Sequence, residues 1–177
     1  MWRALAFGRT GLSVCISMNL RSASEILKKC VMFAEAVKML SKGALSYTAS
    51  FDKIVFSNGA RVMSLPGGND GSSVRGWTIR GALVLDEAAF FPHLERLMAA
   101  VAPTLTTSPD AELVISSTPS GKNHPFYKLW CNALDSDDWF ASLITIEDAI
   151  KQGLDVDIEH LHQLCPDPIV FDQEYRC

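Results

Sequence analysis

The sequence predicts an α/β fold, in which helices cover both faces of a mostly parallel sheet. Two observations lead to this prediction. Short apolar runs rich in β-branched residues alternate along the chain with longer stretches whose apolar residues recur at helical spacing. The chain has 177 residues, of which 48% are hydrophobic and 20% are charged. That is enough for one folded core and too few for two full domains.

The first strand and helix are expected over residues 12–41. Leu12–Asn19 is apolar and β-branched and ends in polar residues, which is typical of a buried strand. Ser22 or Ser24 is expected to cap the helix that follows, and its apolar periodicity continues to about Leu40.

An antiparallel hairpin insertion is expected over residues 45–65. Three short runs of strand-like sequence follow one another there, and Asn58-Gly59 separates the last two. An Asn-Gly pair between such runs is typical of a tight hairpin turn. The glycine- and serine-rich residues 66–73 then predict a loop.

The rest of the chain continues the alternation, with prolines and glycines marking the breaks. The expected elements are a strand that ends at Asp86, a helix over Leu94–Val101 that ends near Pro103, a buried strand over Glu112–Ser117, a helix over Pro125–Leu134, a strand over Trp139–Ile146, and short helices from Glu147 onward.

Composition excludes several classes of protein. The net charge of −4 gives no overall electrostatic attraction for nucleic acid, so a DNA contact would need a local basic patch. Five cysteines without a CxxC pair are typical of a reducing, cytosolic compartment. No apolar run is long enough to span a membrane, and the apolar run at the start is too short for a secretory signal.

Two adjacent carboxylates, Asp86 and Glu87, follow the apolar run Gly81-Ala-Leu-Val-Leu. A buried strand there would deliver both acids to the rim of the sheet. In nucleotide-hydrolysing folds such a pair is a Walker B motif, in which the first acid holds Mg²⁺ and the second polarises the attacking water. The alternative is a core strand that ends in two solvated acids.

Two further features are candidates for the same site. Ser117 and Thr118 follow the run Val114-Ile-Ser and are expected at the carboxyl edge of the sheet, where ligands bind in open α/β folds. The alternative is an ordinary strand-to-turn ending. Arg75 lies between small residues of a loop, and a guanidinium pairs well with phosphate oxygens. Arg80 competes with it for this role, and either is also explained as a surface residue.

In their order and spacing, these motifs resemble those of phage terminase large subunits, and the resemblance covers nearly the whole chain. The segments that carry it are Asn58–Pro66, Val74–Thr78, Leu83–Phe90, Ile115–Gly121, Phe126-Tyr127 and Phe171–Cys177, the last of which resembles the segment that closes the ATPase domain of the family.

The resemblance implies an ASCE/RecA-like P-loop NTPase core that drives viral DNA into a procapsid, with ATP and Mg²⁺ as cofactors. By this resemblance Asp86 would organise the metal ion and Glu87 would be the general base. Ser117 and Thr118 would belong to the motif that couples hydrolysis to movement. Arg75 would supply an arginine finger, in cis or to the neighbouring subunit of a homo-oligomeric ring.

The implied partners are double-stranded DNA, the portal protein and the small terminase subunit, in the cytoplasm of a bacterial host and without a membrane. The Walker B and coupling motifs would occupy residues 74–121, and a C-terminal strand and helices residues 123–177.

The phosphate-binding loop of this family has no counterpart in the sequence, which contains no G-x-x-x-x-G-K-[ST]. The family order would place that loop before Met1 and a nuclease domain after Cys177, so residues 1–177 would be a single partial ATPase domain. We therefore expect little or no ATPase activity from the chain alone. We also expect marginal solubility, closure of the gap or self-association, because the missing strand would leave two apolar strand edges uncovered.

Two alternatives to the terminase interpretation stay open from the sequence. One is another ASCE ATPase, such as a helicase-like translocase. The other is a non-catalytic prophage remnant that acts only as an interaction module.

Overall fold

The computed structural model describes residues 1–68 and 71–177. The predicted loop over residues 66–73 thus falls partly on two residues outside the described part. The chain divides into two compact units, Met1–Ser116 and Ser117–Cys177.

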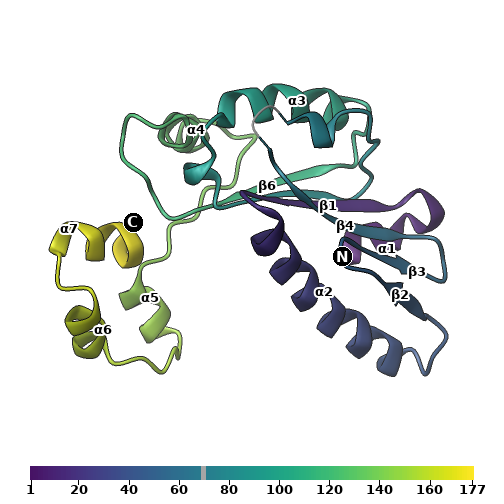
Figure 1. The fold of residues 1–177 in the computed structure, drawn as a ribbon, viewed down its shortest axis with the longest axis horizontal. Helices are drawn as coiled ribbons and strands as arrows, with labels where there is room; N and C mark the ends of the chain where they lie inside the picture. Colours follow the sequence, from purple (N-terminus) through teal and green to yellow (C-terminus); the bar gives the residue numbers. More distant parts are fainter. Residues whose placement is uncertain (69–70) are drawn as a thin grey trace. The chain divides into compact units, whose positions relative to one another are not determined.

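A six-stranded sheet in the order β2-β3-β4-β1-β5-β6 forms the centre of the first unit (Figure 1). Its strands are β1 (Leu12–Ser17), β2 (Tyr47–Ala49), β3 (Lys53–Phe56), β4 (Arg61–Pro66), β5 (Ala82–Asp86) and β6 (Glu112–Ser116).

Strand pairing confirms a mostly parallel sheet. β1 pairs in parallel with β4 and β5, and β5 pairs in parallel with β6, whereas the β2–β3 and β3–β4 pairs are antiparallel. Asn58-Gly59 forms the turn between β3 and β4 as predicted, with a hydrogen bond of 2.8 Å from the Gly59 N–H to the Phe56 carbonyl. The prediction missed that β4 also lies beside β1, so the hairpin is part of the central sheet.

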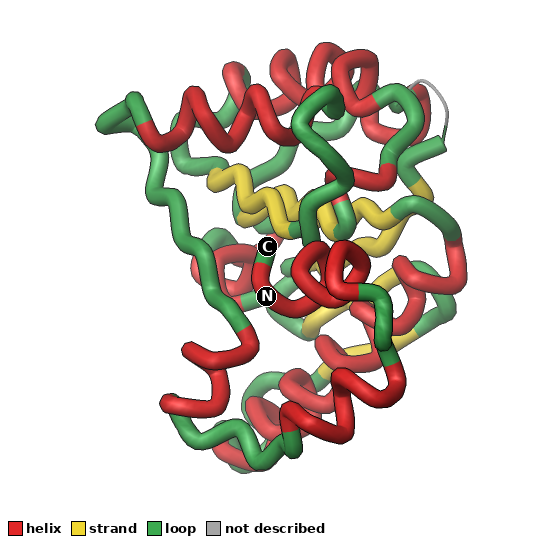
Figure 2. The backbone as a smooth tube through the Cα atoms, turned by 90° about the vertical axis from the view of Figure 1, so that its left-hand side faces the viewer, coloured by secondary structure: helices red, strands yellow, loops and turns green. Residues whose placement is uncertain are grey.

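Helices of the first unit cover both faces of this sheet, as the sequence predicted, with α2 on one face and α3 on the other (Figures 1 and 2). The unit contains α1 (Trp2–Ala6), α2 (Leu20–Leu40), α3 (Leu94–Thr106) and the 3₁₀ turns η1 (Gly8–Thr10), η2 (Ser72–Val74) and η3 (Ala88–Phe90). No helix in the described ranges is both long and apolar enough to cross a membrane.

Two predictions about helix ends are wrong. The cap of α2 is Asn19, whose Oδ1 accepts a hydrogen bond of 2.9 Å from the Ser22 backbone N–H, so neither serine serves as the cap. α3 continues beyond Pro103 to Thr106. Proline has no backbone N–H, so the helix lacks the hydrogen bond that residue 103 would donate to the carbonyl of Ala99. Since Pro103 and Ala99 are both exposed, water can satisfy that carbonyl.

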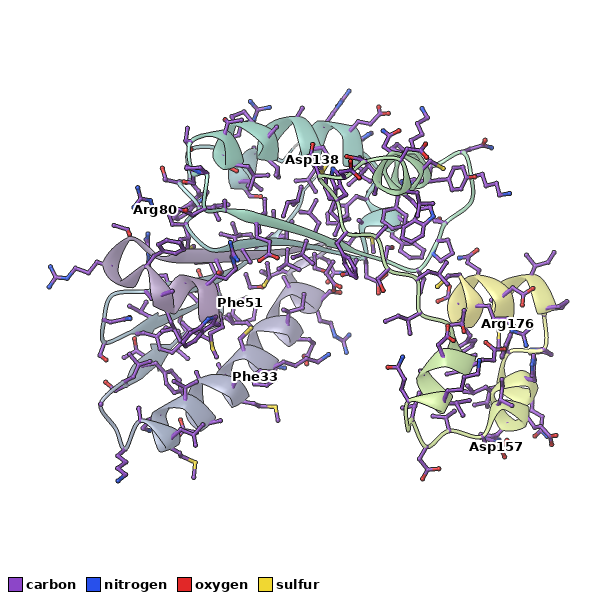
Figure 3. All side chains as sticks on the ribbon, turned by 180° about the vertical axis from the view of Figure 1, so that it is seen from behind. Phe33, Phe51, Arg80, Asp138, Asp157 and Arg176 are labelled. Carbon is purple, nitrogen blue, oxygen red and sulfur yellow. The ribbon has the colours of Figure 1, made fainter. Side chains whose placement is uncertain are left out.

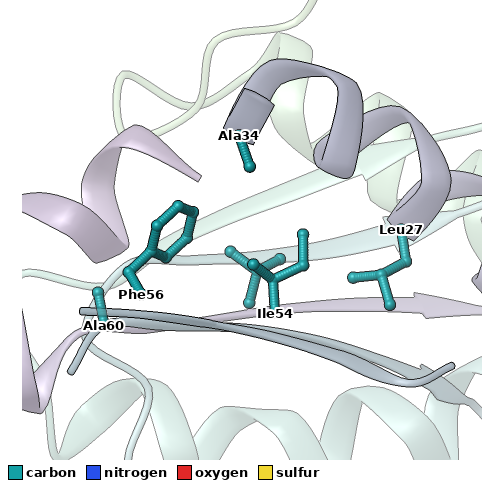
Figure 4. Close-up of a cluster of buried hydrophobic side chains, with 6 residues drawn as sticks. Leu27, Ala34, Ile54, Phe56 and Ala60 are labelled. Carbon is teal, nitrogen blue, oxygen red and sulfur yellow. The ribbon is translucent and has the colours of Figure 1, made fainter. Parts of the chain in front are cut away.

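Beneath α2, a cluster of buried side chains joins the helix to the sheet (Figure 4). Its members are Leu27, Ala34, Ile54, Phe56, Ala60 and Val62. Each fully buried large apolar side chain contributes roughly 1.5–3 kcal/mol. The cluster therefore fixes α2 across β3 and β4.

Alternate residues of β5 are buried, whereas no residue of β6 is fully buried. Leu83 and Leu85 of β5 are completely buried, whereas Ala82, Val84 and Asp86 are only half-buried. β6 is confirmed as a strand, but the prediction that it is buried is wrong, and it ends at Ser116. Its residues alternate between exposed and half-buried because β6 is an edge strand of the described sheet.

The second unit consists of short helices. They are α4 (Pro125–Leu134), α5 (Ile146–Lys151), α6 (Ile158–Leu164), α7 (Pro168–Phe171) and a π-helical turn, η4 (Asp172–Arg176). Arg176, labelled in Figure 3, bridges to Glu147 of α5 at 2.7 Å, and the ring of His162 stacks on Phe171 at 3.7 Å between centroids. These contacts connect the last four elements of the chain.

The predicted strand over Trp139–Ile146 is wrong. Residues 139–145 form neither helix nor strand, and Ile146 begins α5. A capping box explains that start, because Thr145 and Asp148 exchange side-chain and backbone hydrogen bonds. An apolar run of this length becomes a strand only beside another strand, and no described strand pairs with it.

Candidate functional site

Asp86 is the last residue of β5, an inner strand that lies between β1 and β6. The register of the parallel β5–β6 pair places Asp86 beside Ser116, the last residue of β6. The Ser116 hydroxyl donates a hydrogen bond of 3.1 Å to Oδ1 of Asp86. The carboxylate therefore lies at the carboxyl edge of the sheet, the edge at which open α/β folds bind ligands.

Glu87 leaves the line of the strand. Its backbone is left-handed, at φ 57° and ψ 45°, and its side chain is exposed, whereas Ala88 and Ala89 after it are buried in η3. The left-handed region costs an L-residue with a Cβ about 1–2 kcal/mol. Such a conformation persists only where its surroundings impose it, and it is enriched at functional sites.

A close fit between Gly67 and Phe91 restrains this turn. The Gly67 N–H donates a hydrogen bond of 2.9 Å to the carbonyl of Ser17 at the end of β1. A Cβ on Gly67 would lie 2.2 Å from the Phe91 ring, which follows η3 and is 2% exposed. The chain after β4 and the chain after β5 can approach this closely only because residue 67 is glycine.

Ser17 is a site residue that the sequence did not predict. Ile16 pairs with Leu85, so the next residues of the two strands, Ser17 and Asp86, lie side by side on the other face of the sheet. Ser17 is completely buried, and its hydroxyl has no hydrogen-bond partner among the described residues. A small polar residue at the end of a strand is a common pattern. Ser17 is therefore recognised as part of the site only once β1 is known to pair with β5.

The two candidate arginines lie at different edges of the sheet. Arg75 is exposed and directly follows η2. The Ser73 hydroxyl in η2 donates a hydrogen bond of 2.9 Å to the carbonyl of Pro66, at the carboxyl end of β4. Pro66 in β4 lies two strands away from Asp86 in β5, a separation of about 10 Å at the usual spacing between strands. Arg80 lies at the opposite, amino edge, where its carbonyl accepts from Leu12 at 3.0 Å (Figure 3). Of the two, only Arg75 belongs to a segment at the edge that carries Asp86.

Ser117 and Thr118 follow β6 directly and have no regular secondary structure. Both side chains are half-buried, and both residues belong to the second unit. Ser116, the residue before Ser117, makes the hydrogen bond to Asp86. The signal for it is the register of β5 and β6, which the sequence does not reveal.

The oxygen atoms at this edge fit a hard divalent cation. Mg²⁺ is usually bound through one or two carboxylates together with waters and substrate phosphates, and it does not need a closed set of protein ligands. Asp86 supplies a carboxylate at the strand end, and on the neighbouring strand the Ser17 hydroxyl is a buried oxygen without a partner among the described residues. The described residues contain no group of three or more His, Cys, Asp or Glu side chains that would form such a closed set.

Comparison with known proteins is consistent with this geometry. A family model described as terminase large subunit, T4likevirus-type, N-terminal, matches residues 2–177. Two solved structures of the large terminase ATPase domain from Thermus phage P74-26, one of them a point mutant, have a similar fold. Each has a TM-score of 0.77, with 19% identity for the unmutated domain and 17% for the mutant. The match covers 99% of this chain and 78% or 79% of those chains. At such low identity the structural match establishes the fold alone.

Proposed function

Because the chain belongs to the terminase large subunit family, in its N-terminal part, we propose that Asp86 and Glu87 are the Walker B pair of a DNA-packaging ATPase. One observation carries the proposal. Asp86 ends an inner parallel strand at the carboxyl edge of the sheet and accepts a hydrogen bond from the neighbouring strand end. Ligands of open α/β sheets bind at this edge.

Each residue then has a separate role. Asp86 would hold Mg²⁺, and Ser116 orients the Asp86 carboxylate by donating to Oδ1. Glu87, turned out of the strand and exposed, would take the proton of the attacking water. When bound, Mg²⁺ supplies charge that stabilises the transferring phosphoryl group. Arg75 would add a second positive group, in cis or to a neighbouring subunit. Ser117 and Thr118 would couple hydrolysis to movement.

The proposal includes weak activity of the chain in isolation. A phosphate loop holds the triphosphate through backbone N–H groups and a lysine, and the sequence has no such motif. Without a positioned substrate, the acid pair loses most of its catalytic advantage. The other candidate function is a non-catalytic interaction module, in which the acid pair would support no hydrolysis even beside an intact phosphate loop.

The proposed partners are those of a packaging motor: double-stranded DNA, a portal protein, a small terminase subunit and further copies in a ring. With a net charge of −4, contact with DNA would depend on local basic groups.

A chimaera tests the acid pair directly. Residues 82–117 of this chain would replace the matching strands and helix in an active large terminase ATPase domain. We expect ATP hydrolysis to survive the replacement and to fall by about 10²–10⁴-fold after Glu87→Gln. Glu112→Gln is the matched control, since Glu112 lies at the amino end of β6. Equal activity of the Glu87→Gln chimaera and its parent would contradict the proposed role of Glu87.

Metal binding by Asp86 can be measured on the 177-residue chain itself. We expect Mn²⁺, followed by electron paramagnetic resonance, to bind the chain weakly and to bind the Asp86→Asn variant more weakly still. Asp110→Asn is the control, because Asp110 lies beyond the amino end of β6. If both variants bind Mn²⁺ as the parent does, Asp86 is not a metal ligand in this chain.

A further inference from the structure

Three short polar side chains lie next to one another across the carboxyl edge of the sheet. Asp86 at the end of β5 pairs with Ser116 of β6 on one side, and it lies beside Ser17 of β1 on the other. Residues at matching positions of neighbouring parallel strands share a face of the sheet. The Asp86 carboxylate therefore lies between two serines.

The two serine hydroxyls differ in their partners. Ser116 is exposed, and its hydroxyl donates to Oδ1 of Asp86 at 3.1 Å. Ser17 is completely buried, and its hydroxyl has no hydrogen-bond partner among the described residues. A buried hydroxyl without a partner destabilises a fold, because it has lost its hydrogen bonds to water and gained none in return. The Ser17 hydroxyl can therefore make a new hydrogen bond without breaking an existing one.

The position of Ser17 indicates which group can become its partner. Its carbonyl is held by the Gly67 N–H at 2.9 Å, so the end of β1 is fixed while the side chain keeps its donor. Asp86 supplies a charged acceptor on the neighbouring strand and is only half-buried, which leaves its carboxylate room to turn. Ser116 already reaches this carboxylate from β6, across the same spacing of about 4.8 Å between strands. Ser17 can do the same from β1.

We propose that Ser17 is a positioning residue for the metal-bound form of Asp86, in which the Ser17 hydroxyl donates to the Asp86 carboxylate from the side opposite Ser116. A carboxylate that holds a metal ion is oriented by hydrogen bonds from the groups around it. Because Ser17 has no bond to give up, the new bond stabilises the metal-bound form and not the free form. The inference rests on the proposed metal role of Asp86 and adds a second residue to that site.

Replacing Ser17 by alanine should change stability and metal binding in opposite directions. In EDTA, Ser17→Ala removes a buried hydroxyl that makes no bond, so the melting temperature of the 177-residue chain should rise by about 2–4 °C. With Mn²⁺, the same variant lacks the donor to Asp86, so the dissociation constant measured by electron paramagnetic resonance should rise by about 10-fold. A residue that only packs the strand end would not strengthen the fold and weaken the metal site together.

Two other buried serines provide matched controls. The Ser108 hydroxyl is also buried without a partner among the described residues, but Ser108 lies between α3 and β6, before the amino end of that strand. Ser108→Ala should therefore raise the melting temperature and leave Mn²⁺ binding unchanged. The buried Ser64 hydroxyl does have a partner, since it donates to the carbonyl of Ala23 in α2. Ser64→Ala should lower the melting temperature.

Each contrary result separates this inference from the proposed function in a different way. If Ser17→Ala lowers the melting temperature in EDTA, the hydroxyl already has a partner, such as a buried water, and the inference is overturned. If Ser17→Ala binds Mn²⁺ as tightly as the parent chain while Asp86→Asn binds it more weakly, Ser17 does not position the carboxylate, and the proposed role of Asp86 stands. If neither variant changes Mn²⁺ binding, the metal role of Asp86 and the inference fail together.

Discussion

Replacing Glu87 by glycine and by alanine tests whether the left-handed turn of the candidate site stores strain. Glu87 has a φ of 57°, a conformation that costs a residue with a Cβ about 1–2 kcal/mol and costs glycine almost nothing. Both variants remove the carboxylate and every contact that it makes. The comparison therefore isolates the backbone.

The size of the effect follows from two opposing contributions. Glycine gains the roughly 1–2 kcal/mol of relieved strain and loses about 0.5–1 kcal/mol of backbone entropy relative to alanine. We expect Glu87→Gly to be more stable than Glu87→Ala by about 1 kcal/mol. That difference corresponds to roughly 2–4 °C in melting temperature for a chain of this size.

Urea unfolding followed by circular dichroism measures this difference. Ala36→Gly on the exposed side of α2 is the control, and it should be destabilising by about 1 kcal/mol, the opposite sign. If Glu87→Gly is the less stable of the two variants at residue 87, the turn stores no such strain. The link between that strain and a functional site would then be lost as well.

Three further predictions concern the core, the sheet edge and the thiol of Cys30. Leu85→Ala, at a completely buried position of β5, should lower the free energy of unfolding by about 2–5 kcal/mol in urea titrations, whereas Leu134→Ala, at a position 60% exposed, should lower it by less than about 1 kcal/mol. Equal losses would mean that the face of the sheet carrying Leu85 is not a packed core.

The chain should associate through the edge strand β6, so Val114→Lys should shift sedimentation towards the monomer. If Phe33→Lys on the exposed side of α2 (Figure 3) has that effect and Val114→Lys has none, the helix is the contact. Alkylation of Cys30 should rise through a midpoint near pH 7, because its pKa is lowered and thiolate accumulates above that value, and the midpoint should return towards 9 in urea. A native midpoint near 9 would show that Cys15 does not stabilise the thiolate.

The parts of the fold that could be predicted are those with a strong local signal. The apolar runs of β1 and β5, the long periodicity of α2 and the Asn58-Gly59 turn each identify their element without reference to the rest of the chain. Residues 139–145 are equally apolar and form no strand, because strand formation depends on a neighbour that a local pattern does not reveal. Capping is also ambiguous where several suitable side chains are close together, as at Asn19 and Ser22.

Of the candidate site, the position of Asp86 could be predicted from the sequence. The order of apolar residues and acids is sufficient to place Asp86 at the rim of the sheet. The hydrogen-bond partner of Asp86 depends on the register of β5 and β6, which no local sequence pattern reveals. Ser17 appears only when β1 is paired with β5, and the left-handed backbone of Glu87 has no signature because glutamate does not favour it.

The boundary between the two units falls at the peptide bond after Ser116, the residue that donates to Asp86. Ser116 therefore joins the end of β6 to the end of β5 through a side chain, in addition to the backbone pairing of the two strands. Ser116→Ala would release the Asp86 carboxylate from this restraint and leave the parallel register of β5 and β6 in place.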